Sequence, residues 1–337
     1  MRILLVNYEY TLTGSTLLLL RLAGHLHRAG HEVSVYGMVP DPGPVKDAFL
    51  RGGFRIVEPL PSGPFDLALC NTLMTAPLVC RLSPAMKTIW WIHEGSIGVD
   101  LLLRQPSHVA AFAQASAVVF ALPICRDAIY RSFIYHLDPA RFVVIPYGVP
   151  AIAPGPPRPA EPERIRVISV GSVYPRKRHG DLIRAVGLLT DAPLDCTIVG
   201  KFYSLPEDCL RLVAADPGRY RLVGELDNRQ ALQLVAEADI FCLPSGSELQ
   251  PLALLEAALL GKPIVLPDLA VYQGLWRHGR NCLVYPLGDV PLLAQAIALL
   301  ASNPALRRAL AAAAQETARP YTDRAFFARF DALLCSL

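Results

Sequence analysis

The arrangement of this chain is read most directly from residues 243–263, which run Leu243-PSGSELQPLALLEAALLGK-Pro263. The apolar residues that lead into this stretch predict a buried strand ending at Leu243. A polar turn follows, and Pro251 suits the first position of a helix that continues to Leu260. A buried strand followed by a turn and a helix is typical of proteins in which helices cover a parallel sheet.

The same alternation occurs on both sides of this stretch. Apolar runs predict strands and periodic segments predict helices, in an order that indicates an α/β chain with parallel sheets. The expected strands are 3–6, 32–36, 66–70, 88–92, 118–121, 142–145, 166–170, 195–199, 239–243 and 263–266. The expected helices include 15–29, 181–189, 229–236, 252–260, the alanine- and leucine-rich region 291–317, and 322–334.

The chain is expected to form two domains, because 337 residues exceed what one hydrophobic core usually serves. Six prolines fall within residues 150–162, and proline at this density favours an extended linker. We therefore predict a Rossmann-like domain at 1–150, a linker at 151–163 and a second Rossmann-like domain at 164–320. The last segment, 321–337, is expected to be a helix that crosses back to the first domain. Ligands of such proteins bind at the carboxyl ends of the strands, facing the cleft between domains.

The bulk composition excludes several classes of protein. Hydrophobic residues make up 53% and charged residues 18%, which argues against disorder. A net charge of +3 without a basic run gives no indication of nucleic-acid binding. The eight cysteines are scattered, which favours reduced thiols of a cytoplasmic protein over disulfides or a zinc site. The first residues run directly into a predicted strand, and no apolar run reaches the ~20 residues of a membrane helix.

Residues 243–263 also carry candidate chemistry. The amides of Leu252 and Ala253 lie at the positive end of the predicted helix, where a phosphate can bind. Glu256, one turn further on, can accept hydrogen bonds from ribose hydroxyls, and Glu248 can do so from sugar hydroxyls. The alternative is that the glutamates are a capping residue and a solvated helix position. Their occurrence together in one strand-turn-helix unit favours the binding interpretation.

A second loop offers the opposite charge. After the strand at 166–170, Gly171 and Ser172 lead to the basic residues Arg176, Lys177 and Arg178. Cations at the carboxyl edge of a parallel sheet can clamp a diphosphate, although a solvated basic turn is an alternative. No G-x-G-x-x-G motif follows the first strand, which argues against a nicotinamide-dependent dehydrogenase.

Together these motifs resemble a known family. Glu248 and Glu256, with seven residues between them, and the pair Gly171…Lys177 resemble the donor site of retaining glycosyltransferases of family 4, the group 1 enzymes of the GT-B fold. Looser matches follow in the family's order. They are Gly14-Ser15, Gly30-His31-Glu32-Val33, Ile92-His93-Glu94, Ile145-Pro146-Tyr147-Gly148-Val149, Ala238-Asp239 and Leu243-Pro244-Ser245.

The resemblance implies a metal-independent transfer of a hexose from a nucleotide sugar to a saccharide or lipid-linked acceptor, with retention of configuration. It assigns the acceptor to the domain at 1–150 and the nucleotide sugar to the domain at 164–320. It implies that Lys177 neutralises the diphosphate, that Glu248 holds the sugar and that Glu256 binds the ribose. It also places His93 beside the donor sugar across the cleft. Together with the mildly basic net charge, the resemblance also implies peripheral contact with the inner membrane.

The remaining donor contacts implied by the resemblance are backbone contacts. Gly14 would let the backbone approach the phosphates, and the nucleobase would lie near Val223 and Gly224. This sequence departs from the family where Ser172 replaces a frequent arginine and Pro251 replaces a glycine. A nucleotide-sugar epimerase and a non-catalytic nucleotide-sugar-binding protein of the same fold remain alternatives.

Overall fold

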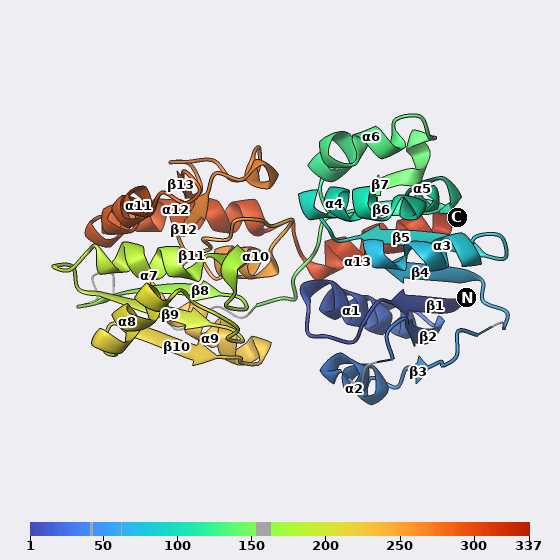
Figure 1. Cartoon of the computed structure of the whole chain (residues 1–337), viewed down its shortest axis with the longest axis horizontal. Helices are drawn as coiled ribbons and strands as arrows, with labels where there is room; N and C mark the ends of the chain where they lie inside the picture. Colours follow the sequence, from blue (N-terminus) through green and yellow to red (C-terminus); the bar gives the residue numbers. More distant parts are fainter. Residues whose placement is uncertain (41–42, 62, 153–162) are drawn as a thin grey trace. The chain divides into compact units, whose positions relative to one another are not determined.

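The computed structural model describes residues 1–40, 43–61, 63–152 and 163–337, which divide into two compact units (Figure 1). Unit 1 comprises Met1–Gly148 and Asp323–Leu337, and unit 2 comprises Val149–Thr322. Each unit contains one sheet in which all strands are parallel, as the alternation of strands and helices predicts. The predicted linker lies outside the described residues from 153 to 162.

The sheet of unit 1 has the strand order β3-β2-β1-β4-β5-β6-β7. Residues Ile3 to Val6 of β1 are all fully buried, which shows that both faces of the sheet are covered. The strands are β1 (Arg2–Asn7), β2 (Glu32–Gly37), β3 (Arg55–Ile56), β4 (Leu67–Asn71), β5 (Lys87–Ile92), β6 (Ala117–Phe120) and β7 (Phe142–Val144). The helices are α1 (Gly14–Arg28), α2 (Pro44–Arg51), α3 (Ala76–Leu82), α4 (Ser96–Arg104), α5 (Ala110–Gln114), α6 (Arg131–Ile134) and α13 (Asp323–Ser336).

The last helix, α13, is part of unit 1 although the rest of that unit ends at Gly148. Its aromatic side chains pack on β5, where the rings of Trp91 and Phe330 lie 4.9 Å apart. Polar contacts with α1 hold the helix in place, including an ion pair between Arg21 and Asp323. Burial of an aromatic face together with these contacts explains why the end of the chain packs against its beginning.

The sheet of unit 2 has the order β10-β9-β8-β11-β12-β13. The strands are β8 (Ile165–Val170), β9 (Leu194–Val199), β10 (Tyr220–Gly224), β11 (Ile240–Cys242), β12 (Ile264–Pro267) and β13 (Leu283–Tyr285). The helices are α7 (His179–Gly187), α8 (Glu207–Ala215), α9 (Asn228–Glu237), α10 (Leu252–Leu259), α11 (Val290–Ser302) and α12 (Pro304–Ala318).

Two separate hydrophobic cores cover the faces of this second sheet. Side chains of a strand point alternately to opposite faces, and in β11 Ile240 and Cys242 join one core whereas Phe241 joins the other. The first core includes residues of α7 and α11, and the second includes residues of α10 and α12. Unit 2 is therefore a three-layer α/β structure, and the chain has the doubly wound fold that its pattern predicts.

Some local features differ from expectation. Strands β3, β10 and β13 and helix α8 were not predicted, because each is short or flanked by polar residues. Pro251 precedes α10 as its N-cap, with ψ 121°, instead of being its first helical residue. All eight cysteines are free thiols. Among the described helices, none combines the length and the apolar character needed to cross a bilayer.

Candidate functional site

The candidate site lies where the strand order of the unit 2 sheet reverses. Strand β8 has β9 on one side and β11 on the other, so the connections from β8 and β11 leave the sheet in opposite directions. In doubly wound sheets such a point leaves a crevice at the carboxyl ends of the two strands. The loop after β8 carries Lys177, and the loop after β11 carries Glu248.

The two loops bring opposite charges into contact. Lys177 Nζ donates a hydrogen bond to Glu248 Oε1 at 2.5 Å, although 71 positions separate the residues. The side chain of Lys177 is 15% exposed and that of Glu248 is 9% exposed. A mostly buried ion pair of this kind costs desolvation energy, and removal of one partner would leave the other charge buried without compensation.

Backbone contacts hold these loops together. Gly246 N donates to Arg176 O at 2.8 Å, and the Arg176 guanidinium donates to Ser247 O. The same guanidinium stacks over the Tyr174 ring, 5.3 Å from its centroid. Arg176, predicted as a diphosphate ligand, therefore also fixes the loop that presents Glu248.

Glycine is favoured after β8 by its backbone conformation and after β9 by close packing. Gly171 has φ +151°, a conformation that other residues rarely adopt. A Cβ at Gly200, which ends the neighbouring strand, would lie 2.2 Å from Gly171 O. The predicted donor-loop residues Gly171 and Ser172 thus lie against β9, and the Lys177 side chain runs beside Gly171.

The start of α10 presents unused hydrogen-bond donors to the same edge. Leu254 N and Leu255 N bond to Pro251 O, whereas the amides of Leu252 and Ala253 have no partner among the residues that the structure describes. Amides at the first turn of a helix attract anions because the helix dipole adds to their own polarity. Together with Lys177, they offer the donors that a diphosphate needs.

Glu256 lies in a second group of residues, beside the start of α9. Asn228 Nδ2 donates to Glu256 Oε1 at 3.0 Å. Strand β10 ends at Gly224, which precedes α9 by a short turn and has φ +85°. The predicted ribose ligand Glu256 thus contacts the helix that follows Val223 and Gly224. Sequence reasoning missed Asn228, although the capping box of Asp227 and Gln230 marks the start of α9.

His93 of unit 1 is held from both sides of its ring. Its Nδ1 lies 2.7 Å from Tyr147 Oη, and its Nε2 lies 2.7 Å from Asn71 Oδ1. Burial lowers the pKa of His93 to about 3, so the imidazole is neutral at physiological pH. Sequence reasoning missed Asn71 and Tyr147. The available signal was a polar residue at the end of an apolar strand.

Two neighbours of His93 complete this part of unit 1. The Glu94 carboxylate accepts hydrogen bonds from Leu73 N and His93 N, both at 3.0 Å, while burial raises its pKa. Gly14 is the first residue of α1, and a Cβ there would meet nothing within 4 Å. The fold itself therefore does not require glycine at this position.

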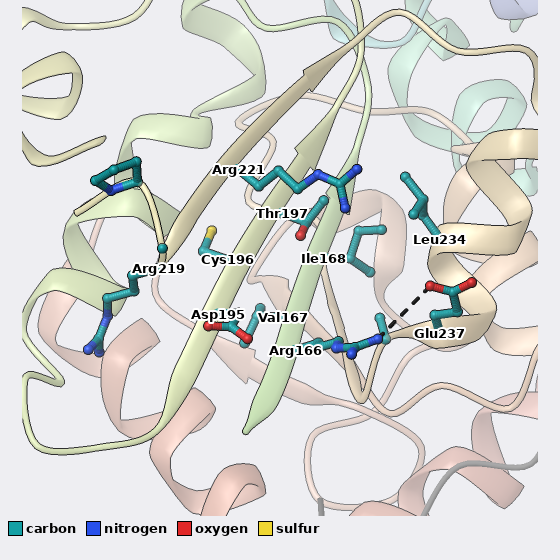
Figure 2. A pocket seen from close by; sticks show the side chains of 13 residues that line it. Arg166, Val167, Ile168, Asp195, Cys196, Thr197, Arg219, Arg221, Leu234 and Glu237 are labelled. Carbon is teal, nitrogen blue, oxygen red and sulfur yellow. Dashed lines mark ion pairs between the residues drawn. The ribbon is translucent and has the colours of Figure 1, made fainter. Parts of the chain in front are cut away.

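A separate hollow of about 370 Å³ lies at the opposite edge of the unit 2 sheet. Figure 2 shows Arg166, near the start of β8, directed toward Glu237 of α9, and Asp195 near the start of the neighbouring strand β9. Arg166 and Glu237 form a loose ion pair at 4.0 Å. This hollow is at the amino ends of the strands, so it is distinct from the edge that carries Lys177 and Glu248.

The side chains that could bind a metal ion are dispersed among the described residues. Within the part of the chain that the structure describes, no three or more His, Cys, Asp or Glu side chains form a group that could hold a metal ion.

Comparison with known proteins relates these features to a family. The family described as "Glycosyl transferases group 1" matches residues 164–303, which contain both loops of the candidate site. A phosphatidyl-myo-inositol mannosyltransferase of Mycobacterium leprae is 33% identical over 102 residues, covering 30% of this chain and 27% of that protein. The protein of the same description from Mycolicibacterium smegmatis is 26% identical over 342 residues, covering 90% of this chain and 84% of its own.

Solved structures share the fold over the whole chain. Anabaena Alr3699/HepE, in a structure described as a complex with UDP and glucose, is similar with a TM-score of 0.81. The similarity covers 100% of both chains at 17% sequence identity. At this identity the similarity establishes the architecture.

Proposed function

We propose, from the premise that this chain is a group 1 glycosyltransferase with the GT-B fold, that it transfers a hexose from a nucleoside-diphosphate sugar with retention of configuration and without a metal ion. The acceptor in this proposal is a saccharide or a lipid-linked molecule. The observation that carries the proposal is the ion pair of Lys177 and Glu248 beside the open amides of α10, at the reversal point of the unit 2 sheet.

In this proposal the donor replaces the ion pair with contacts of its own. The diphosphate carries negative charge, so it competes with Glu248 for Lys177 and adds the amides of Leu252 and Ala253. Glu248, released from Lys177, accepts hydrogen bonds from hydroxyls of the sugar. Glu256 accepts hydrogen bonds from the ribose. In the free protein Lys177 and Glu248 neutralise each other. When the nucleotide sugar binds, Lys177 instead contacts the diphosphate and Glu248 contacts the sugar.

The reaction follows from these contacts. As the bond between the anomeric carbon and the diphosphate breaks, negative charge grows on the leaving oxygen, where Lys177 and the helix amides stabilise it. The acceptor oxygen forms its bond to the anomeric carbon on the same face, which retains the configuration, and the proton of the acceptor hydroxyl passes to the leaving diphosphate oxygen. His93 is the group of unit 1 that we assign to the transferred sugar.

Similarities to known proteins support the proposed classes of donor and acceptor. The relatives from both mycobacteria are named as mannosyltransferases of phosphatidyl-myo-inositol, and the Anabaena structure is described with UDP and glucose. A hexose donor and a lipid-linked acceptor are consistent with these names. An acceptor of this kind would bring the protein to the cytoplasmic face of the membrane.

The test is a transfer assay with the full chain. UDP-, GDP- and ADP-hexoses are combined with phosphatidylinositol vesicles or with oligosaccharides, with and without EDTA. We expect one donor to yield a glycosylated acceptor and an equal amount of nucleoside diphosphate, and NMR to show the donor's anomeric configuration in the product. An inverted product would contradict retention, and loss of activity in EDTA would contradict metal independence. Nucleotide release that does not depend on any acceptor would contradict transfer.

A further inference from the structure

Four polar side chains at the carboxyl edge of the unit 1 sheet form one continuous hydrogen-bonded chain. They are Asn7 at the end of β1, Asn71 at the end of β4, His93 after β5 and Tyr147 after β7. Asn7 Nδ2 donates to Glu9 O at 2.6 Å, and Asn71 Nδ2 lies 3.0 Å from Asn7 Oδ1. The two contacts of His93 then link Asn71 to Tyr147.

The direction of every hydrogen bond in this series of side chains follows from the end at Glu9. Glu9 O is a backbone carbonyl and can only accept, so Asn7 turns its NH₂ group toward it and its Oδ1 toward Asn71. Asn71 must then donate to Asn7 and turn its own Oδ1 toward His93. An amide oxygen cannot donate, so Nε2 of His93 carries the hydrogen.

The other ring nitrogen completes the assignment. In a neutral imidazole with a hydrogen on Nε2, Nδ1 is an acceptor. Tyr147 Oη, 2.7 Å away, therefore donates to it. His93 is thus specified as a single tautomer by partners on both sides.

Burial separates the roles of these four side chains. Asn71 is 0% exposed, Asn7 1% and Tyr147 5%, whereas His93 retains part of its surface. Among the four, His93 is the least buried. The others act through it, as groups behind a functional residue commonly do.

We propose that Asn71 and Tyr147 are positioning residues that hold His93 as the neutral Nε2–H tautomer, so that the transferred sugar meets an uncharged imidazole. The hydrogen on Nε2 follows from the hydrogen bonds, the neutral state of the ring is favoured by its burial, and the consequence for the sugar rests on the function proposed above.

The physical advantage lies in the charge of the reacting sugar. The anomeric carbon gains positive charge as its bond to the diphosphate breaks, and an imidazolium nearby would repel it. A neutral ring held by neutral partners avoids this repulsion. The low pKa of His93, caused by burial, agrees with the arrangement.

The titratable groups around His93 are consistent with a neutral ring. Glu94 accepts a hydrogen bond from His93 N, and an ionised carboxylate there would favour an imidazolium. Burial raises the pKa of Glu94, which weakens that influence. Tyr130 donates its hydroxyl to Glu94 O at 2.9 Å, and burial raises the pKa of both Tyr130 and Tyr147, so both phenols stay neutral. The Trp91 ring, 4.4 Å from the imidazole, adds no charge.

Nitrogen NMR of the full chain labelled in histidine tests the assignment without any substrate. The His93 signals are identified by their loss in His93→Gln. We expect a protonated Nε2 and a bare Nδ1, with no conversion to imidazolium between about pH 8 and about pH 5. A hydrogen on Nδ1, or an imidazolium above about pH 6, would overturn the proposal.

Enzyme kinetics test the consequence. We expect Tyr147→Phe and Asn71→Leu to lower kcat by roughly 10- to 100-fold, as loss of an orienting partner does, with the donor KM unchanged. Both variants should also lose the single-tautomer nitrogen signals. The matched control is Tyr10→Phe in the same unit. The Tyr10 ring is fully buried, and its hydroxyl has no partner within the described residues, so kcat and the His93 signals should not change.

The outcomes separate this inference from the proposed function. Wild-type kcat in a correctly folded Tyr147→Phe, checked by thermal unfolding, would overturn the positioning role. Absence of sugar transfer by the wild-type protein, with the Nε2–H signals present, would contradict the function while leaving the tautomer assignment intact.

Discussion

The two sheets reverse their strand order in the same way but fill the reversal point differently. In unit 1, between β1 and β4, neutral side chains bond to one another, as Asn71 does with Asn7. In unit 2, between β8 and β11, the ion pair of Lys177 and Glu248 lies near helix amides that have no partner among the described residues. A hydrogen-bond network whose members are all paired keeps its side chains in fixed positions. An edge with a charged pair and unpaired amides has hydrogen-bond donors left for an anionic ligand.

The buried histidines show the same contrast. Both ring nitrogens of His93 are hydrogen-bonded, whereas both of His179, at the start of α7, are buried without a partner in the described parts of the chain. Burial and the nearby Lys177 lower the pKa of His179 to about 4. The ring nitrogens of His93 are therefore satisfied before any ligand binds, and those of His179 are not satisfied by any described residue.

The largest expected effect comes from breaking the ion pair of unit 2. Lys177→Met should abolish measurable transfer and destabilise the protein by about 3–5 kcal/mol, because it leaves a buried carboxylate without its partner. Adding Glu248→Gln should restore most of the stability but none of the activity. Urea unfolding and the transfer assay measure the two effects separately.

The control for this prediction is Lys46→Met. Lys46 pairs with Glu58 at 3.0 Å in unit 1, but the two side chains are 22% and 39% exposed. Activity should be unchanged and stability should change by less than about 1 kcal/mol. Equal losses in Lys177→Met and Lys46→Met would show that the unit 2 pair has no special role.

A smaller effect is expected from acid. The pKa of His179 is lowered in the folded protein, so the unfolded chain binds its proton first as the pH falls below about 6.5. Stability is therefore fully present above that pH and falls by up to about 1.4 kcal/mol per pH unit for such a histidine until its folded pKa is reached. His179→Gln should reduce this slope between pH 6 and pH 4 by about one proton, measured by urea unfolding.

An identical slope in His179→Gln and the wild-type protein would mean that His179 is protonated in the folded state.

The smallest effect on stability is expected at Gly14. A Cβ there meets nothing within 4 Å, so Gly14→Ala should raise the stability by up to about 1 kcal/mol through the unfolded state. Calorimetry with the donor then tests the predicted role, because a phosphate close to this backbone would be displaced by the added methyl group. Unchanged donor affinity would remove Gly14 from the donor site.

Local patterns placed Lys177 and Glu248 at the same edge of a parallel sheet, because each residue follows an apolar strand, but they did not predict the ion pair between the two side chains. The network of Asn7, Asn71 and Tyr147 was not predictable, since it depends on which strands are neighbours, and short-range periodicity does not contain that order. Pro251 illustrates a finer limit. Its φ suits both a first helical position and an N-cap, and only ψ separates them.

The central claim is that the reversal point of unit 2 binds the diphosphate of the donor. Calorimetric titration of the full chain with UDP, GDP and ADP tests it most directly. The account predicts that at least one of them binds to the wild-type protein and to Lys46→Met with equal affinity. Its affinity for Lys177→Met/Glu248→Gln should be weaker by about tenfold or more, the loss of one charge-assisted hydrogen bond. Equal affinity for the double variant and the wild-type protein would contradict the account.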